Sequence, residues 1–145
     1  MASYVPHKEV FEVIEQVSKE SSRAKKIDLL QENASPALKD LLRGAYDDVV
    51  QWALPPGDPP YTPAEESSVP SSFRRQHKQF AYFAKGIPQY ARLRPLKRET
   101  MFISFLESIH PKDAELILLM KEKKSLGKGI TKKLVQEAFP NLIKQ

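Results

Sequence analysis

The stretch "HPKDAELILLMKEKK", His110 to Lys124, sets the architecture of this chain. Pro111 suits the first turn of a helix, and Asp113 and Glu115 precede lysines at the other end, an order of charges that complements the helix dipole. Between them, Leu116 to Met120 is apolar on every side. A helix without a polar face is typical of the interior of a protein. We therefore expect this helix at the centre of an all-α fold.

Three short helices are predicted at the start of the chain. The first begins near Pro6 and has apolar residues at helical spacing. The second spans residues 24–33. The third starts at "SPALKDLLRGAY", in which Ser35 is a good N-cap and Pro36 suits the first helical position. Because short connections make sequential helices neighbours, these three should form a compact unit.

Residues 53–72 interrupt the helical pattern with six of the twelve prolines of the chain. Proline removes a backbone donor and cannot continue a helix, so we expect a proline-rich linker or arm within a single domain that covers residues 1–145. It could cross the surface and pack onto the helices, which we favour. It could also present a polyproline-type segment to a partner, with Trp52 and Tyr61 as anchors.

The segments after the linker alternate between helical and irregular patterns. Residues 72–86, "SFRRQHKQFAYFAKG", predict a helix with its three phenylalanines facing inward and Gly86 as its end. Residues 87–96 contain two prolines and are predicted to be irregular. Residues 97–109, "KRETMFISFLESI", predict another buried helix.

Composition excludes several classes of chemistry. With no cysteine, the chain has no disulfide, thiolate metal site or thiol nucleophile. No segment approaches the roughly 18 apolar residues of a membrane-spanning helix, and the N-terminus lacks a signal-like apolar run, so we expect no membrane contact and no export. Of the three histidines, His7 lies beside the first helix, His77 should share a cationic surface, and His110, at an expected cap position, should help to end a helix. No motif pairs a base with a nucleophile or a metal, so we expect a protein that is not an enzyme and needs no cofactor.

The net charge of +5 is distributed unevenly. Residues 1–66 contain 7 Lys and Arg against 12 Asp and Glu, whereas residues 67–98 contain 8 against none. Like charges held together favour an anionic partner. The acidic first third of the chain could also fold against the basic segment and neutralise it.

The basic segment is the main candidate site. Its cations could neutralise phosphates, and its tyrosines could stack on bases. The phenylalanines have helical spacing and are expected in the core. The candidate residues are Arg74, Arg75, Lys78, Tyr82, Lys85, Tyr90, Arg92, Arg94, Lys97 and Arg98.

A second candidate lies in "LGKGITKKLVQEAFPN", residues 126–141. A phosphate-binding loop is excluded, because the first glycine and the final Ser or Thr of that motif are missing. The final helix, which Thr131 can cap, could instead read DNA through Lys132, Lys133 and Gln136, near its N-terminal end. The preceding connection is longer than that of a helix-turn-helix motif, so an ordinary joint between helices is the default.

Several stretches of the chain resemble a known family. They are "KKIDLLQENASPALKDLLRGAYDDVVQWALPPGDPPYTP", "ESIHPKDAELIL" and "KGITKKLVQEAFPNL". They are similar to small proteins of large contractile-tailed phages, including phages of cyanobacteria, over nearly the whole chain. The resemblance implies a phage product that acts in the cytoplasm of the infected cell or is packed in the virion. It assigns no activity and no site residue.

These observations predict a binding protein rather than an enzyme. We expect a phage accessory protein that engages nucleic acid, or a host complex on nucleic acid, through residues 74–98. The alternative is a structural or adaptor protein of the phage particle, whose basic face meets an acidic protein surface.

Overall fold

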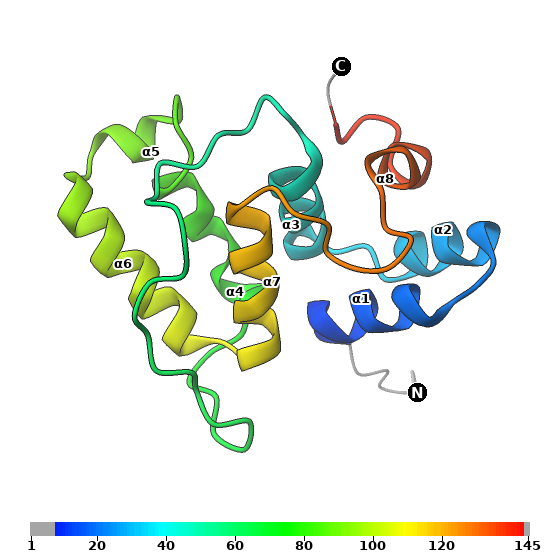
Figure 1. Cartoon of the computed structure of the whole chain (residues 1–145), viewed down its shortest axis with the longest axis horizontal. Coiled ribbons are helices and arrows are strands. Elements are labelled where there is room, and N and C mark those ends of the chain that lie inside the picture. The colour runs from blue at the N-terminus through cyan, green and yellow to red at the C-terminus, as the bar shows by residue number, and fades with distance from the viewer. Residues whose placement is uncertain (1–7, 144–145) are drawn as a thin grey trace, which may run out of the picture.

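The computed structural model describes residues 8–143, which form eight α-helices and one 3-10 helix around helix α7 (Pro111–Lys121) (Figure 1). This confirms the prediction of an all-α fold. The predicted start of the first helix at Pro6, and His7, lie outside the described residues. The other elements are α1 (Val10–Lys19), α2 (Arg23–Glu32), α3 (Pro36–Tyr46), α4 (Phe73–Gln76), the 3-10 helix η1 (His77–Tyr82), α5 (Pro88–Ala91), α6 (Pro95–Ser108) and α8 (Lys132–Ala138).

Helix α7 has the central position that its sequence predicts. It contacts α1, α3 and α6, which surround it on several sides. His110 caps its first turn, because its Nδ1 accepts a hydrogen bond from the backbone N–H of Lys112 at 3.0 Å. The apolar run between the charged ends is buried at Leu116, Ile117, Leu118 and Met120.

Helices α1, α2 and α8 form one side of the molecule, at the right of Figure 1. Helix α2 packs against both α1 and α8. The predicted caps are present, since the hydroxyl of Ser35 accepts from the backbone of Leu38 and that of Thr131 accepts from Leu134. Such caps satisfy amides that the first helical turn leaves without partners.

Helices α4, α5 and α6 form the other side, and here two predictions need correction. The helix expected over residues 72–86 is divided into α4 and η1, although all three phenylalanines face inward as predicted. Their ring centroids lie within 6.2 Å of that of Phe105. Residues 87–96 are not wholly irregular, because Pro88 and Pro95 begin α5 and α6. At the first helical position the missing N–H of proline is not needed.

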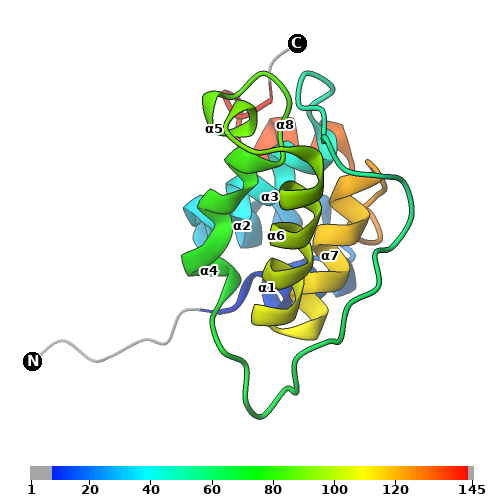
Figure 2. The same ribbon diagram turned by 90° about the vertical axis from the view of Figure 1, so that its left-hand side faces the viewer.

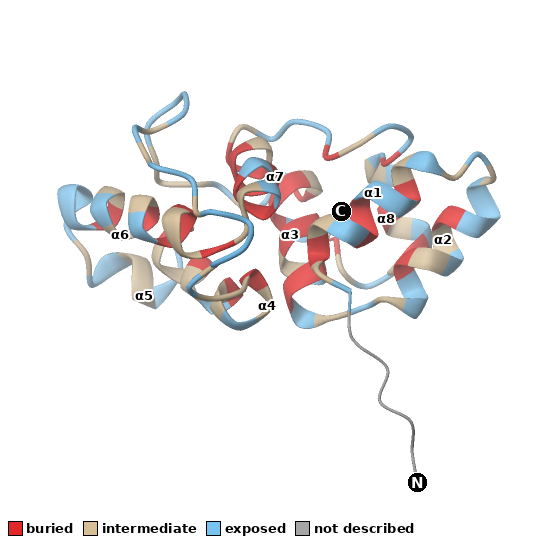
Figure 3. Cartoon of the chain, turned by 90° about the horizontal axis from the view of Figure 1, so that it is seen from below, coloured by how far each residue is buried: buried red, intermediate tan, exposed pale blue. Residues whose placement is uncertain are grey.

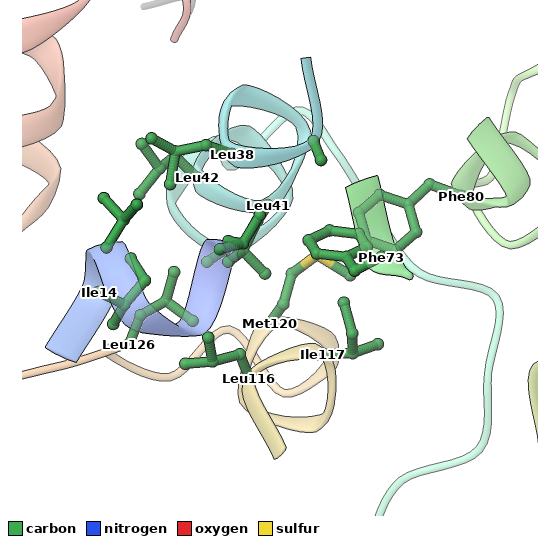
Figure 4. Packing of buried hydrophobic residues seen from close by; sticks show 14 of the residues in the cluster. Ile14, Leu38, Leu41, Leu42, Phe73, Phe80, Leu116, Ile117, Met120 and Leu126 are labelled. Atoms are coloured by element: carbon green, nitrogen blue, oxygen red, sulfur yellow. The ribbon is translucent and has the colours of Figure 1, made fainter. Parts of the chain in front are cut away.

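The core is continuous between the two sides (Figures 3 and 4). Side chains from α1, α3, α4 and α7 gather in one cluster, in which Leu41 and Met120 lie near Phe73. Gly44 allows this close packing on α3. A Cβ atom at that position would lie 2.6 Å from both the Met120 sulfur and the Trp52 ring.

The proline-rich segment crosses the edge of the molecule opposite α4 and α5 (Figure 2). The ammonium group of Lys121 fixes its beginning by donating to the carbonyls of Pro55, at 2.9 Å, and Gly57, at 2.8 Å. Its end is fixed by a hydrogen bond from the Ser71 amide to the Ser108 carbonyl. The segment therefore lies along α6 and α7 rather than extending away from them. None of the described helices has the length and apolar character needed to cross a bilayer.

Candidate anion-binding surface

The basic segment begins on α4 and ends in the first turn of α6. Phe73 and Phe80 fill the core, and the three cations between them lie at or near the surface. Arg75 and Lys78 are exposed, and Arg74 is half-buried. The aromatic anchors thus hold the neighbouring cations at the surface.

Arg98 is the exception, and its prediction as a surface contact is wrong. Its side chain is buried, with the residue 5% exposed. The guanidinium donates to the carbonyls of Tyr82 at 3.1 Å, Tyr90 at 3.0 Å and Leu93 at 2.8 Å. It joins the end of η1 to α5 and to the loop before α6. Arg98 positions this part of the surface instead of contacting a partner.

The two tyrosines proposed as stacking groups also serve the fold. Tyr82 and Tyr90 are half-buried. Tyr82 packs against the hydrophobic core, and the Arg98 guanidinium lies 4.2 Å from the centre of the Tyr90 ring. One face of Tyr90 is therefore already occupied by a cation–π contact. Neither ring is a fully open platform.

Seven cations remain between α4 and the first turn of α6, and together they are called the cationic surface. Six of them are exposed and one is half-buried. Within residues 8–143, none of the seven has a carboxylate within ion-pair distance. They are Arg74, Arg75, Lys78, Lys85, Arg92, Arg94 and Lys97.

The acidic first third of the chain directs its ion pairs elsewhere. Glu15 pairs with Lys112 at 3.2 Å. Asp48 pairs with Lys132 at 3.0 Å, and this hydrogen bond lowers the pKa of the Asp48 carboxyl. The sequence left open whether this acidic third neutralises the basic segment. Among the described residues, only one ion pair joins the two, and it is formed by Asp40.

Asp40 of α3 pairs with His77 of η1. The His77 Nδ1 lies 2.5 Å from the Asp40 Oδ2, and the histidine is buried. The prediction that His77 shares the cationic surface is wrong, because its ring faces α3. The pair contributes to the wall of a groove that the sequence pattern does not reveal.

This groove, called the Trp52 groove, lies between α3, η1 and the start of α5, and has a volume of about 400 Å³. Val50, Trp52 and Ile87 supply apolar wall, while Arg43, Lys78 and Gln89 supply polar groups. The groove has no cysteine, serine or threonine among its lining residues, so His77 faces no nucleophile there. In the described part of the chain, no cluster of three His, Cys, Asp or Glu residues is suited to a metal ion.

Lys132, Lys133 and Gln136 lie on α8, on the opposite side of the molecule from the cationic surface (Figure 1). Lys133 is exposed, Gln136 is half-buried, and Lys132 is held by Asp48. Helix α8 packs against α2 and α3. The structure therefore does not join the two predicted sites into one.

The glycines before α8 are explained by packing. A Cβ atom on Gly127 would lie 2.2 Å from the Ser18 hydroxyl oxygen. Gly129 has a φ of +73° and lies over the ammonium group of Lys26. That ammonium donates to the carbonyls of Val17, at 2.7 Å, and Lys128, at 3.2 Å. The turn thus accommodates a lysine of the same chain, as expected for a joint between helices.

Two titratable groups near the ends of α7 have shifted pKa values. Burial raises the pKa of Asp113 to about 7, even though the Phe11 amide donates to its Oδ1 at 3.0 Å. Its Oδ2 is buried and has no hydrogen-bond partner among the described residues. Burial also lowers the pKa of the Lys123 ammonium, which donates to the carbonyls of Gly44 and Asp47. Both shifts are explained by burial within the fold.

A family model matches most of the chain. The model of a family of unknown function, DUF6433, matches residues 13–128. The chain belongs to this family. No functionally curated protein matches the chain.

The DUF6433 match includes all of the cationic surface and all residues that line the Trp52 groove. It ends before α8, so the candidate residues at 132, 133 and 136 lie outside it. Because the family has no known function, it assigns no role to any of these residues.

Proposed function

We propose that this DUF6433 protein is a non-catalytic accessory protein that binds nucleic acid, or a host complex on nucleic acid, through the cationic surface. One observation carries the proposal. Seven cations between α4 and the first turn of α6 have no carboxylate partner among the described residues. Mutual repulsion among such charges is relieved when phosphates bind and release their counterions.

The resemblance to proteins of contractile-tailed phages supports an infected cell as the setting in which the protein acts. In that setting the protein is a phage product that acts in the cytoplasm of the infected host cell, with the virion as the alternative. Capture from infected cells with and without nuclease separates direct nucleic-acid binding from binding to a host complex. A host complex that stays bound after nuclease treatment is contacted through protein.

An exposed leucine favours the second candidate, an adaptor that binds an acidic protein surface. Leu96 is 76% exposed and lies in sequence between Arg94 and Lys97. An apolar residue among charges is a common component of protein interfaces. An interface of this kind retains an apolar part that salt barely weakens, whereas phosphate contacts weaken steeply with salt.

The salt dependence of binding tests the proposal. Fluorescence anisotropy of a labelled duplex and its single strand, between about 50 and 200 mM salt, gives the slope of log affinity against log salt. If all seven cations touch duplex phosphates, the slope approaches about −6. Polyglutamate serves as a control polyanion. Absent binding, or equal binding to polyglutamate, would reject nucleic acid as the specific partner.

A further inference from the structure

We infer that the Trp52 groove receives an unpaired base of single-stranded nucleic acid whose phosphates lie on the cationic surface. The inference rests on the proposed function and adds the class of nucleic acid. Lys78 belongs to both sites, because it lines the groove and is one of the seven cations. Lys85 directly follows Ala84, another groove residue. A strand on the cationic surface therefore passes the groove.

The apolar wall of the groove is held rigidly. The segment that carries Trp52 pairs with the segment after η1 through two backbone hydrogen bonds, Ala53 N–H to Phe83 O at 2.7 Å and Lys85 N–H to Gln51 O at 2.9 Å. The indole Nε1 of Trp52 donates to the Gly44 carbonyl at 3.0 Å. A binding site built on such fixed groups loses little conformational entropy when a ligand binds.

The indole is further fixed by the aromatic core. Its ring meets the Phe80 ring edge-on, with the centroids 5.5 Å apart. Trp52 is only partly buried and is one of the residues that line the groove. The Ile87 side chain, 39% exposed, supplies apolar surface in the same groove. These two side chains provide an apolar surface against which the flat ring of a base can pack.

The polar groups of the groove suit a nucleotide. Gln89 can donate to and accept from a base edge, and Lys78 can meet a phosphate. Arg43, whose Nε pairs with Asp47 at 3.6 Å, can also meet a phosphate. The one carboxylate that lines the groove is Asp40, which pairs with His77. In a duplex the bases are stacked and paired, so only a single strand can place a base in the groove. Aromatic contacts with unpaired bases are largely independent of sequence.

The single tryptophan of the chain provides a direct measurement. In a titration with an oligothymidylate single strand, we expect saturable quenching of Trp52 fluorescence. A duplex of the same length should bind the cationic surface and leave this fluorescence almost unchanged. The wild-type chain therefore reports groove occupancy separately from overall binding.

A pair of neutral substitutions tests the groove wall. Ile87→Ser removes exposed apolar wall without changing charge, and we expect single-strand affinity to fall about tenfold while duplex affinity stays the same. Val49→Ser is the matched control. Val49 is 66% exposed and does not line the groove, so both affinities should stay unchanged.

The outcomes separate this inference from the proposed function. If single strand and duplex bind equally without quenching Trp52, the groove inference fails and the proposed function remains. If neither binds, both fail. A peptide rich in glutamate and leucine is the competing occupant. If it quenches Trp52 and oligothymidylate does not, the groove binds protein and the inference is overturned.

Discussion

The guanidinium carbon of Arg98 lies 4.2 Å from the centre of the Tyr90 ring, and the same guanidinium donates to the Tyr90 carbonyl. A cation from the first turn of α6 thus holds both the side chain and the backbone of α5. Neighbouring Arg94 and Lys97 are exposed. The start of α6 therefore uses one cation internally and presents two neighbouring cations to solvent.

Replacing Arg98 by methionine should lower the free energy of unfolding by about 2–4 kcal/mol, because three carbonyls lose a charged donor. Arg92→Met is the matched control. Arg92 is exposed, so this substitution should change the free energy of unfolding by no more than about 0.5 kcal/mol. Urea denaturation monitored by circular dichroism gives both values. Equal effects of the two substitutions would show that the buried hydrogen bonds do not stabilise the fold.

The pH dependence of stability should reflect Asp113. Its pKa is about 7 in the folded protein, against an ordinary value of 3.8, with burial as the largest cause and Glu9 and Glu12 raising it further. Between these values the folded state binds more protons than the unfolded state. Stability contributed by the protonated group is therefore lost as the pH rises from about 4 to about 7, by roughly 2–4 kcal/mol.

Asp113→Asn should flatten this dependence, because the amide keeps an acceptor for the Phe11 N–H and cannot ionise. Glu115→Gln, on the exposed surface of the same helix, is the control and should leave the slope unchanged. Denaturation in urea over the same pH range measures the slope. An Asn variant with the wild-type slope would assign the pH dependence to other groups.

The sequence predicts the elements whose signal is local. The apolar residues 116–120 identify the central helix, because no polar face is left for solvent. The cap residues Ser35 and Thr131 mark helix starts, since a hydroxyl three residues before an amide can accept from it. The phenylalanines of residues 73–83 indicate the direction of the core. Their spacing does not identify the change to a 3-10 helix at His77.

The sequence could not predict which cations are internal. Arg98 and Lys121 are held by backbone carbonyls, and every residue type has a carbonyl, so the pattern carries no signal. The Trp52 groove is missed for a related reason. Its residues come from positions 40–89 and meet only through tertiary packing. Only Trp52 is marked by the sequence, as a possible anchor for a partner.

Releasing Lys121 should loosen the proline-rich segment. Lys121→Met removes donors to the Pro55 and Gly57 carbonyls, so residues 55–70 should open more often. In the wild-type protein, limited proteolysis should cut this segment before it cuts the flanking helices. In the variant, the protease should cut the segment roughly tenfold faster. The control variant Lys124→Met changes an exposed position, so its proline-rich segment should be cut at the wild-type rate. First cleavage within α6 would contradict the prediction.

The cationic surface is tested by changing Arg74, Arg75 and Lys78 together to glutamine. The change removes three positive charges and keeps the inward phenylalanines, so folding should change by no more than about 0.5 kcal/mol per site. Affinity for duplex and single strand should fall. The slope of log affinity against log salt should flatten by up to about one unit for each phosphate that the variant no longer neutralises.

The matched control removes the same charge from elsewhere, by changing Lys19, Lys25 and Lys124 to glutamine. All three are exposed and lie outside the cationic surface. If the surface binds phosphates locally, this control should reduce affinity much less, because salt screens charges separated by more than about 8–10 Å. Equal losses of affinity in the two triple variants would assign binding to net charge alone. Marked destabilisation of the first variant would show that its three cations stabilise the fold, and would favour the adaptor function instead.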